Sequence, residues 1–200
     1  FPALLTTGFY DIVAGGMFNM WAKMSEESKN KSAFVVSPYD HSDSCDAENS
    51  IVFPMGKRAE KFGDLYEIDW FDYVRGKRQA PFETGKITYY SIFENCWKTE
   101  TSLAPTDYIN IPLGDSEVSY VYNPYDPPQF KGGLSRAFGG VVYQDKPNSR
   151  YDIISVYTNP FEDDVLVKGK MSATLSVKSD CEDTCFYVRV SIEKQTGDYG

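Results

Sequence analysis

The chain is organised around one ten-residue sequence, Ser32-Ala33-Phe34-Val35-Val36-Ser37-Pro38-Tyr39-Asp40-His41. The apolar run from Ala33 to Ser37 predicts a short buried strand, and the Pro-aromatic pair after it predicts that the strand ends in a loop. That loop presents His41, the only histidine of the 200 residues. Because a rigid strand fixes where its loop begins, this arrangement favours a general base aimed at a substrate; a surface or structural histidine is the alternative interpretation.

A second strand with a polar loop precedes this stretch. The run from Ala3 to Thr7 predicts a short buried strand, Gly8 permits a sharp change of direction, and Asp11 lies in the loop that follows. Between the two strands the sequence predicts a helix from Gly16 to about Ser28. We expect the apolar face of this helix to lie in the core; that face carries Met17, Met20, Trp21 and Met24.

The order of these elements predicts two parallel strands joined by a helix. Reactive groups of parallel sheets lie in loops beyond the carboxyl ends of the strands, and Asp11 and His41 both occupy such loops. If the strands are neighbours, Asp11 can accept a hydrogen bond from one imidazole nitrogen and fix the tautomer of the ring. Asp40 and Asp43 are rival partners, but residues so near in sequence rarely have the geometry to reach the imidazole. A loop or helix-capping role is the alternative for Asp11.

The composition argues against several classes of function. The 29 acidic residues outnumber the 20 basic ones and give a net charge of −9, which argues against binding to nucleic acid or to anionic membranes. No apolar run approaches the roughly 20 residues that cross a bilayer, and no signal segment opens the chain, so we expect a cytoplasmic location. The abrupt start at Phe1 predicts that the true N-terminus is absent.

The cysteines do not follow the pattern of a metal site. Their spacing matches no zinc motif, and one histidine cannot complete the usual mixed site. We expect free thiols, because a cytosolic protein keeps its cysteines reduced, although the last two are near enough in sequence to pair. We predict no metal and no other cofactor. The four residues are Cys45, Cys96, Cys181 and Cys185.

The sequence changes character after about residue 78. A helix is predicted from Asp64 to about Arg75, with Asp64 as its N-cap and Gly76 as its stop. The polar, turn-rich segment from Gly76 to Gly85 predicts a domain boundary, which gives domains 1–78 and 86–200. The second domain has an all-β pattern that fits a jelly roll or other β-sandwich. Its predicted strands are 87–93, 108–113, 118–122, 153–158, 171–179 and 185–192.

Two motifs resemble a known family. Gly8-Phe9-Tyr10-Asp11 and the segment from Phe34 to His41 resemble the last two triad segments of the α/β-hydrolases that include cocaine esterases, α-amino-acid ester hydrolases and X-Pro dipeptidyl-peptidases. Ser37 and Tyr39 replace the glycine and tryptophan usual in that family, and neither change removes a catalytic group. Later segments that also resemble the family are Trp70 to Gly76, Tyr122 to Pro128 with Gly132-Gly133, and Phe161 to Gly169.

This resemblance implies a fold and two site residues. By it, Asp11 is the triad acid and His41 is the general base. The chain would form the C-terminal end of an α/β-hydrolase domain followed by a partial jelly-roll β-sandwich. The nucleophile of this fold usually lies in a GxSxG pentapeptide, which the sequence lacks; the nearest segment, Gly133-Leu134-Ser135-Arg136-Ala137, has no second glycine.

The order Ser, Asp, His in this fold places the serine before Phe1, in a missing N-terminal part of the hydrolase domain that also contributes to the oxyanion hole. We therefore expect a portion of a serine hydrolase that acts on a small ester or on a peptide bond after proline. The portion alone is expected to be inactive. The alternative is a non-catalytic β-sandwich binding module attached to a remnant α/β segment.

Overall fold

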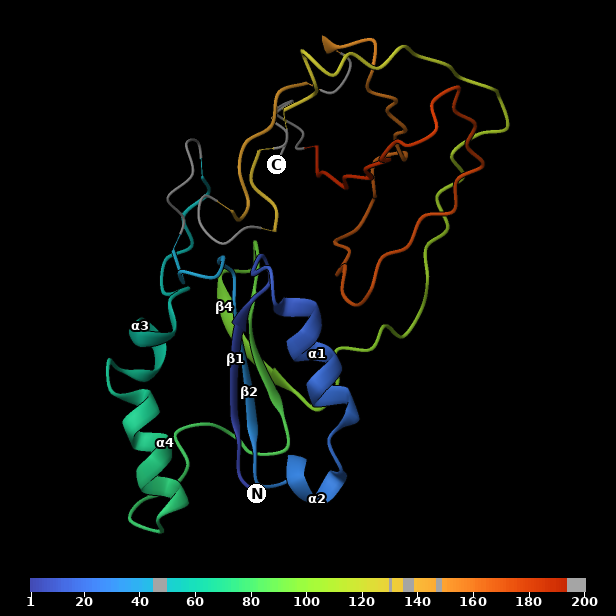
Figure 1. Cartoon of the computed structure of the whole chain (residues 1–200). Coiled ribbons are helices and arrows are strands. Elements are labelled where there is room, and N and C mark those ends of the chain that lie inside the picture. The colour runs from blue at the N-terminus through green and yellow to red at the C-terminus, as the bar shows by residue number, and fades with distance from the viewer. Residues whose placement is uncertain (45–49, 130, 135–138, 147–148, 194–200) are drawn as a thin grey trace. The chain divides into compact units, whose positions relative to one another are not determined.

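The computed structural model describes residues 1–44, 50–129, 131–134, 139–146 and 149–193. The chain forms two compact units, one of Phe1–Ser102 with Gln129–Tyr143 and one of Leu103–Pro128 with Gln144–Gly200. Within the described residues, the helices and strands all lie between Leu4 and Glu100, in the first unit (Figure 1).

The first unit is built on a mixed sheet. The described strands follow the order β1 (Leu4–Gly8), β2 (Ala33–Ser37), β3 (Ile87–Ser91) and β4 (Cys96–Glu100). β1 pairs with β2 in parallel, β2 with β3 in parallel, and β3 with β4 in antiparallel orientation. The predicted bounds of the central strand and its parallel pairing with the preceding strand are confirmed.

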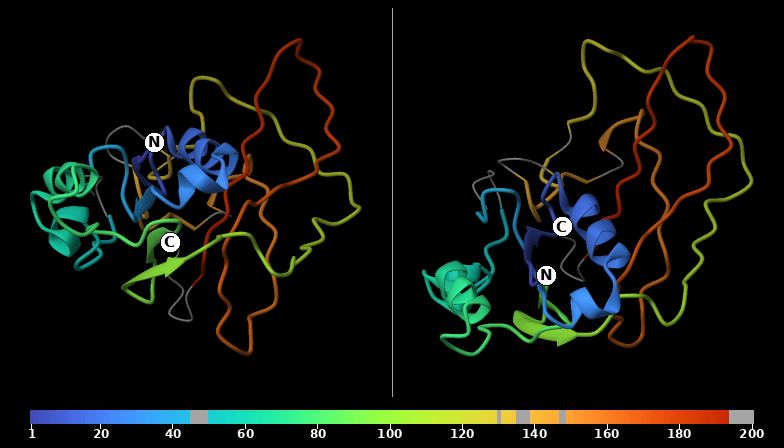
Figure 2. Two further views of the ribbon diagram at one scale, coloured as in Figure 1. Left: turned by 90° about the horizontal axis from the view of Figure 1, so that it is seen from below. Right: turned by 60° about the horizontal axis from the view of Figure 1, so that its bottom comes forward.

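Helices cover both faces of the sheet. On one face, Phe34 of β2 lies 5.0 Å from Phe18 and 5.8 Å from Trp21, measured between ring centroids, and both belong to α1 (Ala14–Lys23). On the other face, Val35 packs in a cluster with Trp70 of α4 (Tyr66–Val74). Successive strand residues point to opposite faces, so α1 and α4 enclose β2 between them, as the separate views show (Figures 1 and 2).

The helix predicted from Gly16 to Ser28 is two helices, which corrects that prediction. The chain leaves the helical conformation at Met24, and Ser25 caps α2 (Glu26–Lys29) by accepting a hydrogen bond from the Ser28 amide. The expected core face is also partly wrong, because Trp21 is buried whereas Met20 is half exposed. The helix contacts Phe34 of the sheet through Phe18 and Trp21.

The second predicted helix starts later than expected. α4 begins at Tyr66 and has Leu65 at its N-cap without a side-chain cap, so Asp64 is not the cap. Gly76 ends the helix as predicted: its φ of 72° is left-handed, and its amide donates to the carbonyl of Tyr73. A further short helix, α3 (Arg58–Phe62), was not predicted.

The boundary predicted between residues 78 and 86 lies inside the first unit. Phe82 is buried, and its ring contacts those of Phe62 and Trp70. The strand predicted at 87–93 is β3, which pairs with β2 instead of opening a separate sheet. The segment therefore belongs to the core of the first unit, which continues to Ser102.

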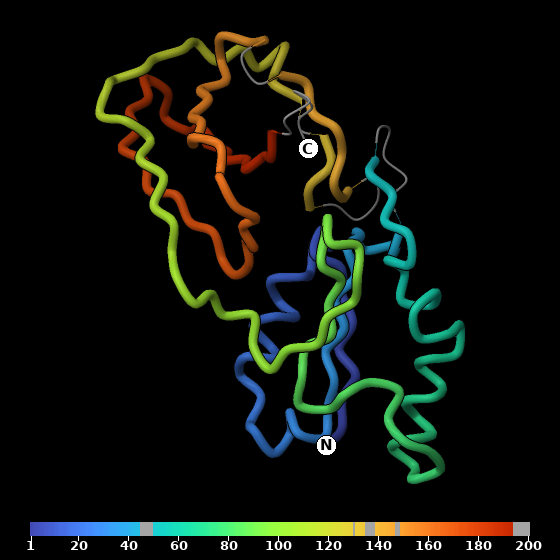
Figure 3. Tube along the Cα trace, turned by 180° about the vertical axis from the view of Figure 1, so that it is seen from behind, coloured from blue at the N-terminus to red at the C-terminus, as the bar shows by residue number. Residues whose placement is uncertain are grey.

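The second unit consists of irregular chain in its described residues (Figure 3). The segments predicted as strands at 108–113, 118–122, 153–158, 171–179 and 185–192 do not pair as strands there, and the jelly roll stays a prediction. An ionic cluster links two distant parts of this unit. Arg150 donates to both oxygens of Asp152 at 2.8 Å, and its Nη2 donates to the carbonyl of Asp126 at 2.7 Å.

Two further sequence predictions concern thiols and membranes. Cys96, Cys181 and Cys185 are free, as predicted, and Cys45 lies outside the described residues. In the described part of the chain, no helix has the length and apolar character needed to span a membrane.

Candidate active site

The site is built where β1 and β2 end side by side. Gly8 is opposite Ser37 in the register of the two strands. The chains stay together past this point, because Phe9 donates to the Ser37 carbonyl at 2.9 Å and Tyr10 donates to the Tyr39 carbonyl at 3.2 Å. This continued pairing brings the residues that follow each strand to the same edge of the sheet.

Gly8 makes the close approach of the two loops possible. A Cβ atom at this position would lie 1.9 Å from the carbonyl oxygen of Tyr39. No side chain can occupy that space, so only glycine allows the end of β1 to lie against the loop that carries His41.

Asp11 and His41 meet at this edge, as the sequence predicted. Nδ1 of His41 lies 3.0 Å from Oδ1 of Asp11. The carboxylate is buried and held from two further sides: its Oδ1 accepts from the Val13 amide at 3.0 Å, and its Oδ2 accepts from the Thr7 hydroxyl at 3.1 Å. These bonds fix the orientation of the acid relative to the imidazole.

The imidazole is accessible although its partner is buried. The side chain of His41 is 49% exposed, whereas that of Asp11 is 6% exposed. A proton on Nδ1 directed at the carboxylate leaves Nε2 as the acceptor of the ring. The pair therefore has the geometry of a general base in which the buried Asp11 carboxylate sets the tautomer and the orientation of the imidazole.

The rival carboxylates have other partners. Asp40 is buried, and it accepts from the Ser42 amide at 2.9 Å and from the Gly139 amide at 3.1 Å. Asp43 accepts from the Arg58 amide at 3.2 Å. Of the three carboxylates that the sequence offered, Asp11 is the one that contacts the imidazole in the described structure.

Tyr39 and Gly139 are supports of the site that sequence reasoning missed. The buried Tyr39 hydroxyl donates to the Phe53 carbonyl at 2.8 Å and accepts from the Phe53 amide at 3.3 Å. Gly139 reaches the loop from 99 residues further along the chain to bind Asp40. The only local signal for these supports was Tyr39 itself, the aromatic residue that follows Pro38. No spacing rule predicts that Tyr39 binds Phe53 or that Asp40 binds Gly139.

Tyr10 immediately precedes Asp11, one of the two residues of the Asp11–His41 dyad, and its phenol stays neutral. Burial raises the pKa of the Tyr10 phenol above its ordinary value, and the side chain packs against the cluster that contains Tyr39 and Tyr90. At neutral pH this phenol is protonated and carries no charge.

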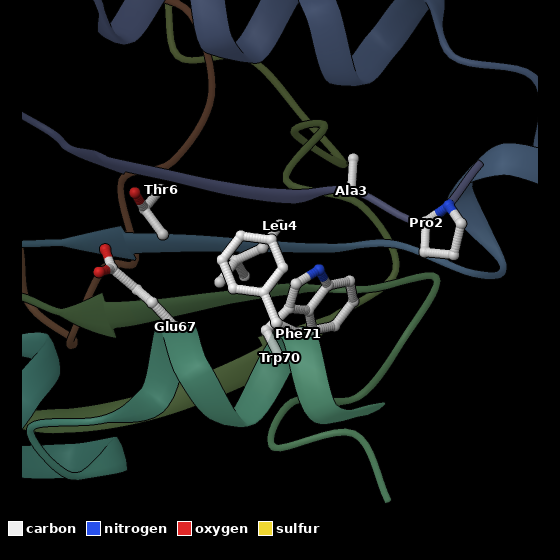
Figure 4. A pocket seen from close by; sticks show the side chains of 7 residues that line it. All are labelled: Pro2, Ala3, Leu4, Thr6, Glu67, Trp70 and Phe71. Carbon is white, nitrogen blue, oxygen red and sulfur yellow. The ribbon is translucent and has the colours of Figure 1, made fainter. Parts of the chain in front are cut away.

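A separate pocket of about 380 Å³ lies between β1 and α4 (Figure 4). It lies along the first part of β1, whereas the dyad follows the end of that strand. The pocket is therefore separate from the Asp11–His41 pair. It is lined by Pro2, Ala3, Leu4, Thr6, Glu67, Trp70 and Phe71.

Comparison with known proteins gives a distant similarity to an esterase. No family model matches the chain. The cocaine esterase of Rhodococcus sp. (strain MB1 Bresler) is 24% identical over 217 aligned positions, which cover 94% of this chain and 38% of that protein. The chain thus spans less than two fifths of the length of this relative. The similarity supports an α/β-hydrolase-type relationship at this distance.

Proposed function

We propose that this chain supplies the acid and the general base of a serine hydrolase, Asp11 and His41. The observation that carries the proposal is the 3.0 Å contact between His41 Nδ1 and the buried Asp11 carboxylate, at the ends of two neighbouring parallel strands. The distant similarity to an esterase favours esters as substrates, and peptide bonds after proline are the second class to test.

In this mechanism each residue has one task. Nε2 of His41 accepts the proton of the serine hydroxyl as the oxygen attacks the carbonyl carbon, and it returns that proton to the leaving group. Asp11 keeps the imidazole in the required tautomer and stabilises the imidazolium that forms. The nucleophile and the oxyanion hole would come from a part of the protein that this chain does not span; a GxSxG segment there is expected.

The test uses the full-length protein, an activated ester and a fluorophosphonate probe. We expect wild type to be labelled at a serine, and His41→Ala to lose about 10³-fold or more of its turnover because the base is gone. Asp72→Asn is the control variant and should keep wild-type turnover, since it removes only a surface ion pair with Lys77. Hydrolysis of an Xaa-Pro anilide, compared with that of the ester, identifies the substrate class.

Two results would contradict the proposal. The first is near-normal turnover in His41→Ala. The second is a full-length protein without serine labelling, which would favour the non-catalytic binding module. The 200-residue chain alone is expected to hydrolyse neither substrate.

A further inference from the structure

We propose that Arg58 is a positioning residue for the dyad, a role that rests on the proposed function. Arg58 is the first residue of α3, and its side chain is only 12% exposed. Its Nη1 donates to the carbonyl oxygen of Thr7 at 2.9 Å. A guanidinium is costly to bury, so the contacts that it makes there need an explanation.

The same residue holds the loop that carries His41. The Arg58 amide donates to Oδ2 of Asp43 at 3.2 Å, and Nη2 lies 3.6 Å from Oδ1 of that carboxylate. Asp43 has a φ of 54°, a left-handed conformation in which aspartate is one of the commoner residues after glycine. Such a conformation persists where its surroundings hold it, and Arg58 contacts Asp43 through both backbone and side chain.

These contacts close a ring around the dyad. Thr7 accepts from Arg58 through its carbonyl and donates to Asp11 Oδ2 through its hydroxyl. Asp11 contacts His41, which lies two residues before Asp43, a further partner of Arg58. Arg58 therefore joins the strand end that positions the acid to the loop that positions the base.

The ring is not optimised for stability alone. The buried atoms without a hydrogen-bond partner in the described residues include two that belong to this ring, Arg58 Nε and Asp43 Oδ1. Unsatisfied buried polar atoms cost free energy, and apolar side chains in place of both Arg58 and Asp43 would avoid that cost. A buried cation that bridges the end of β1 and the loop that carries His41 is the pattern expected of a residue whose role is to position these two segments.

The first measurement uses residues 1–200 and needs no catalysis. His41 is the only histidine, so the imidazole ¹⁵N and Nδ1–H resonances report this ring alone. We expect wild type to show a protected Nδ1–H and Asp11→Ala to lose it. Arg58→Met should lose it as well, whereas Arg78→Met, which removes an ion pair with Asp69, should keep it.

The second measurement is ester turnover by the full-length protein. Misplacement of a base by about 1 Å can cost about 10²-fold, so Arg58→Met should lower kcat by about that factor with KM unchanged. Arg58→Lys should give an intermediate kcat, because one ammonium cannot contact Thr7 and Asp43 as a planar guanidinium does. Arg58→Lys also serves as the test variant if circular dichroism shows that Arg58→Met does not fold.

The outcomes separate this inference from the proposed function. Wild-type Nδ1–H protection and wild-type kcat in a folded Arg58 variant would overturn the inference and leave the dyad standing. A full-length protein that hydrolyses neither an ester nor an Xaa-Pro anilide would overturn the proposed function, and loss of the Nδ1–H signal in Arg58→Met would still show that Arg58 positions the ring.

Discussion

The two units of the chain contain similar apolar segments but bury them to different extents. In the first unit Phe34, Val35 and Val36 are completely buried, because β2 has a strand on each side and a helix on each face. In the second unit Val121 is 77% exposed and Tyr187 is 81% exposed. An alternating sequence creates an apolar face, but only a neighbouring element can cover it. The proposed site lies in the unit where that cover exists.

Amide hydrogen exchange should show the largest difference between the units. The amides of β2 (Ala33–Ser37) lie in a buried ladder, whereas residues 171–179 are exposed and unpaired as a strand. Opening free energies run from near zero to the global value of about 5 kcal/mol or more, so β2 should exchange at least about 5,000-fold more slowly. Mass spectrometry of peptides from both segments measures this. Comparable protection at 171–179 would contradict the irregular second unit and favour the predicted jelly roll.

Removal of one buried ring should affect only the first unit. Phe34→Ala deletes a ring packed against α1 and should lower the free energy of unfolding by about 3–5 kcal/mol. Phe161→Ala removes the same ring from an exposed position and should change it by less than about 0.5 kcal/mol. Urea unfolding followed by circular dichroism and tryptophan fluorescence checks both. Equal losses would mean that the second unit has a core of its own.

Two glycines of the first unit should respond in opposite directions. Gly8→Ala places a methyl group against the Tyr39 carbonyl, and such overpacking costs about 1–3 kcal/mol or more. Gly16→Ala in α1 meets nothing within 4 Å and should stabilise the helix by up to about 1 kcal/mol. Thermal unfolding measures both. A neutral Gly8→Ala would show that the close approach of the two loops is not required.

The features that could be predicted from the sequence are those with a local signal. The apolar run before Pro38 set the bounds of β2, and the order of strands and loops predicted that Asp11 and His41 would meet. The break between α1 and α2 was missed because the apolar spacing continues through it, while the cap at Ser25 decides the structure.

The features that were missed depend on contacts distant in sequence. β3 reads as the start of a β domain by composition, yet its register with β2 places it in the first sheet. Asp40 read as a rival for the imidazole, whereas its partner Gly139 is far away in the chain. Arg58 had no motif at all. The residues that support a site are those that the fold places next to it. Hydrophobic periodicity reports local structure and gives no information on such long-range contacts.

The smallest effect is expected in the second unit, at the ionic cluster of Arg150 and Asp152. Hydrogen bonds from Arg150 lower the pKa of the Asp152 carboxyl below its ordinary 3.8. A lowered folded-state pKa means that the stabilisation is present above the unfolded-state pKa and is lost as the pH falls through the folded-state value. The Arg150 Nε–H resonance should therefore be protected near neutral pH and lose protection in acid, while Asp152→Asn should remove that pH dependence. The tryptophan fluorescence is the control and should not follow this titration, because Trp21, Trp70 and Trp97 all belong to the first unit. If the fluorescence followed the titration, protonation of Asp152 would also change the first unit. The apolar core of the first unit would then not be independent of the ionic cluster in the second.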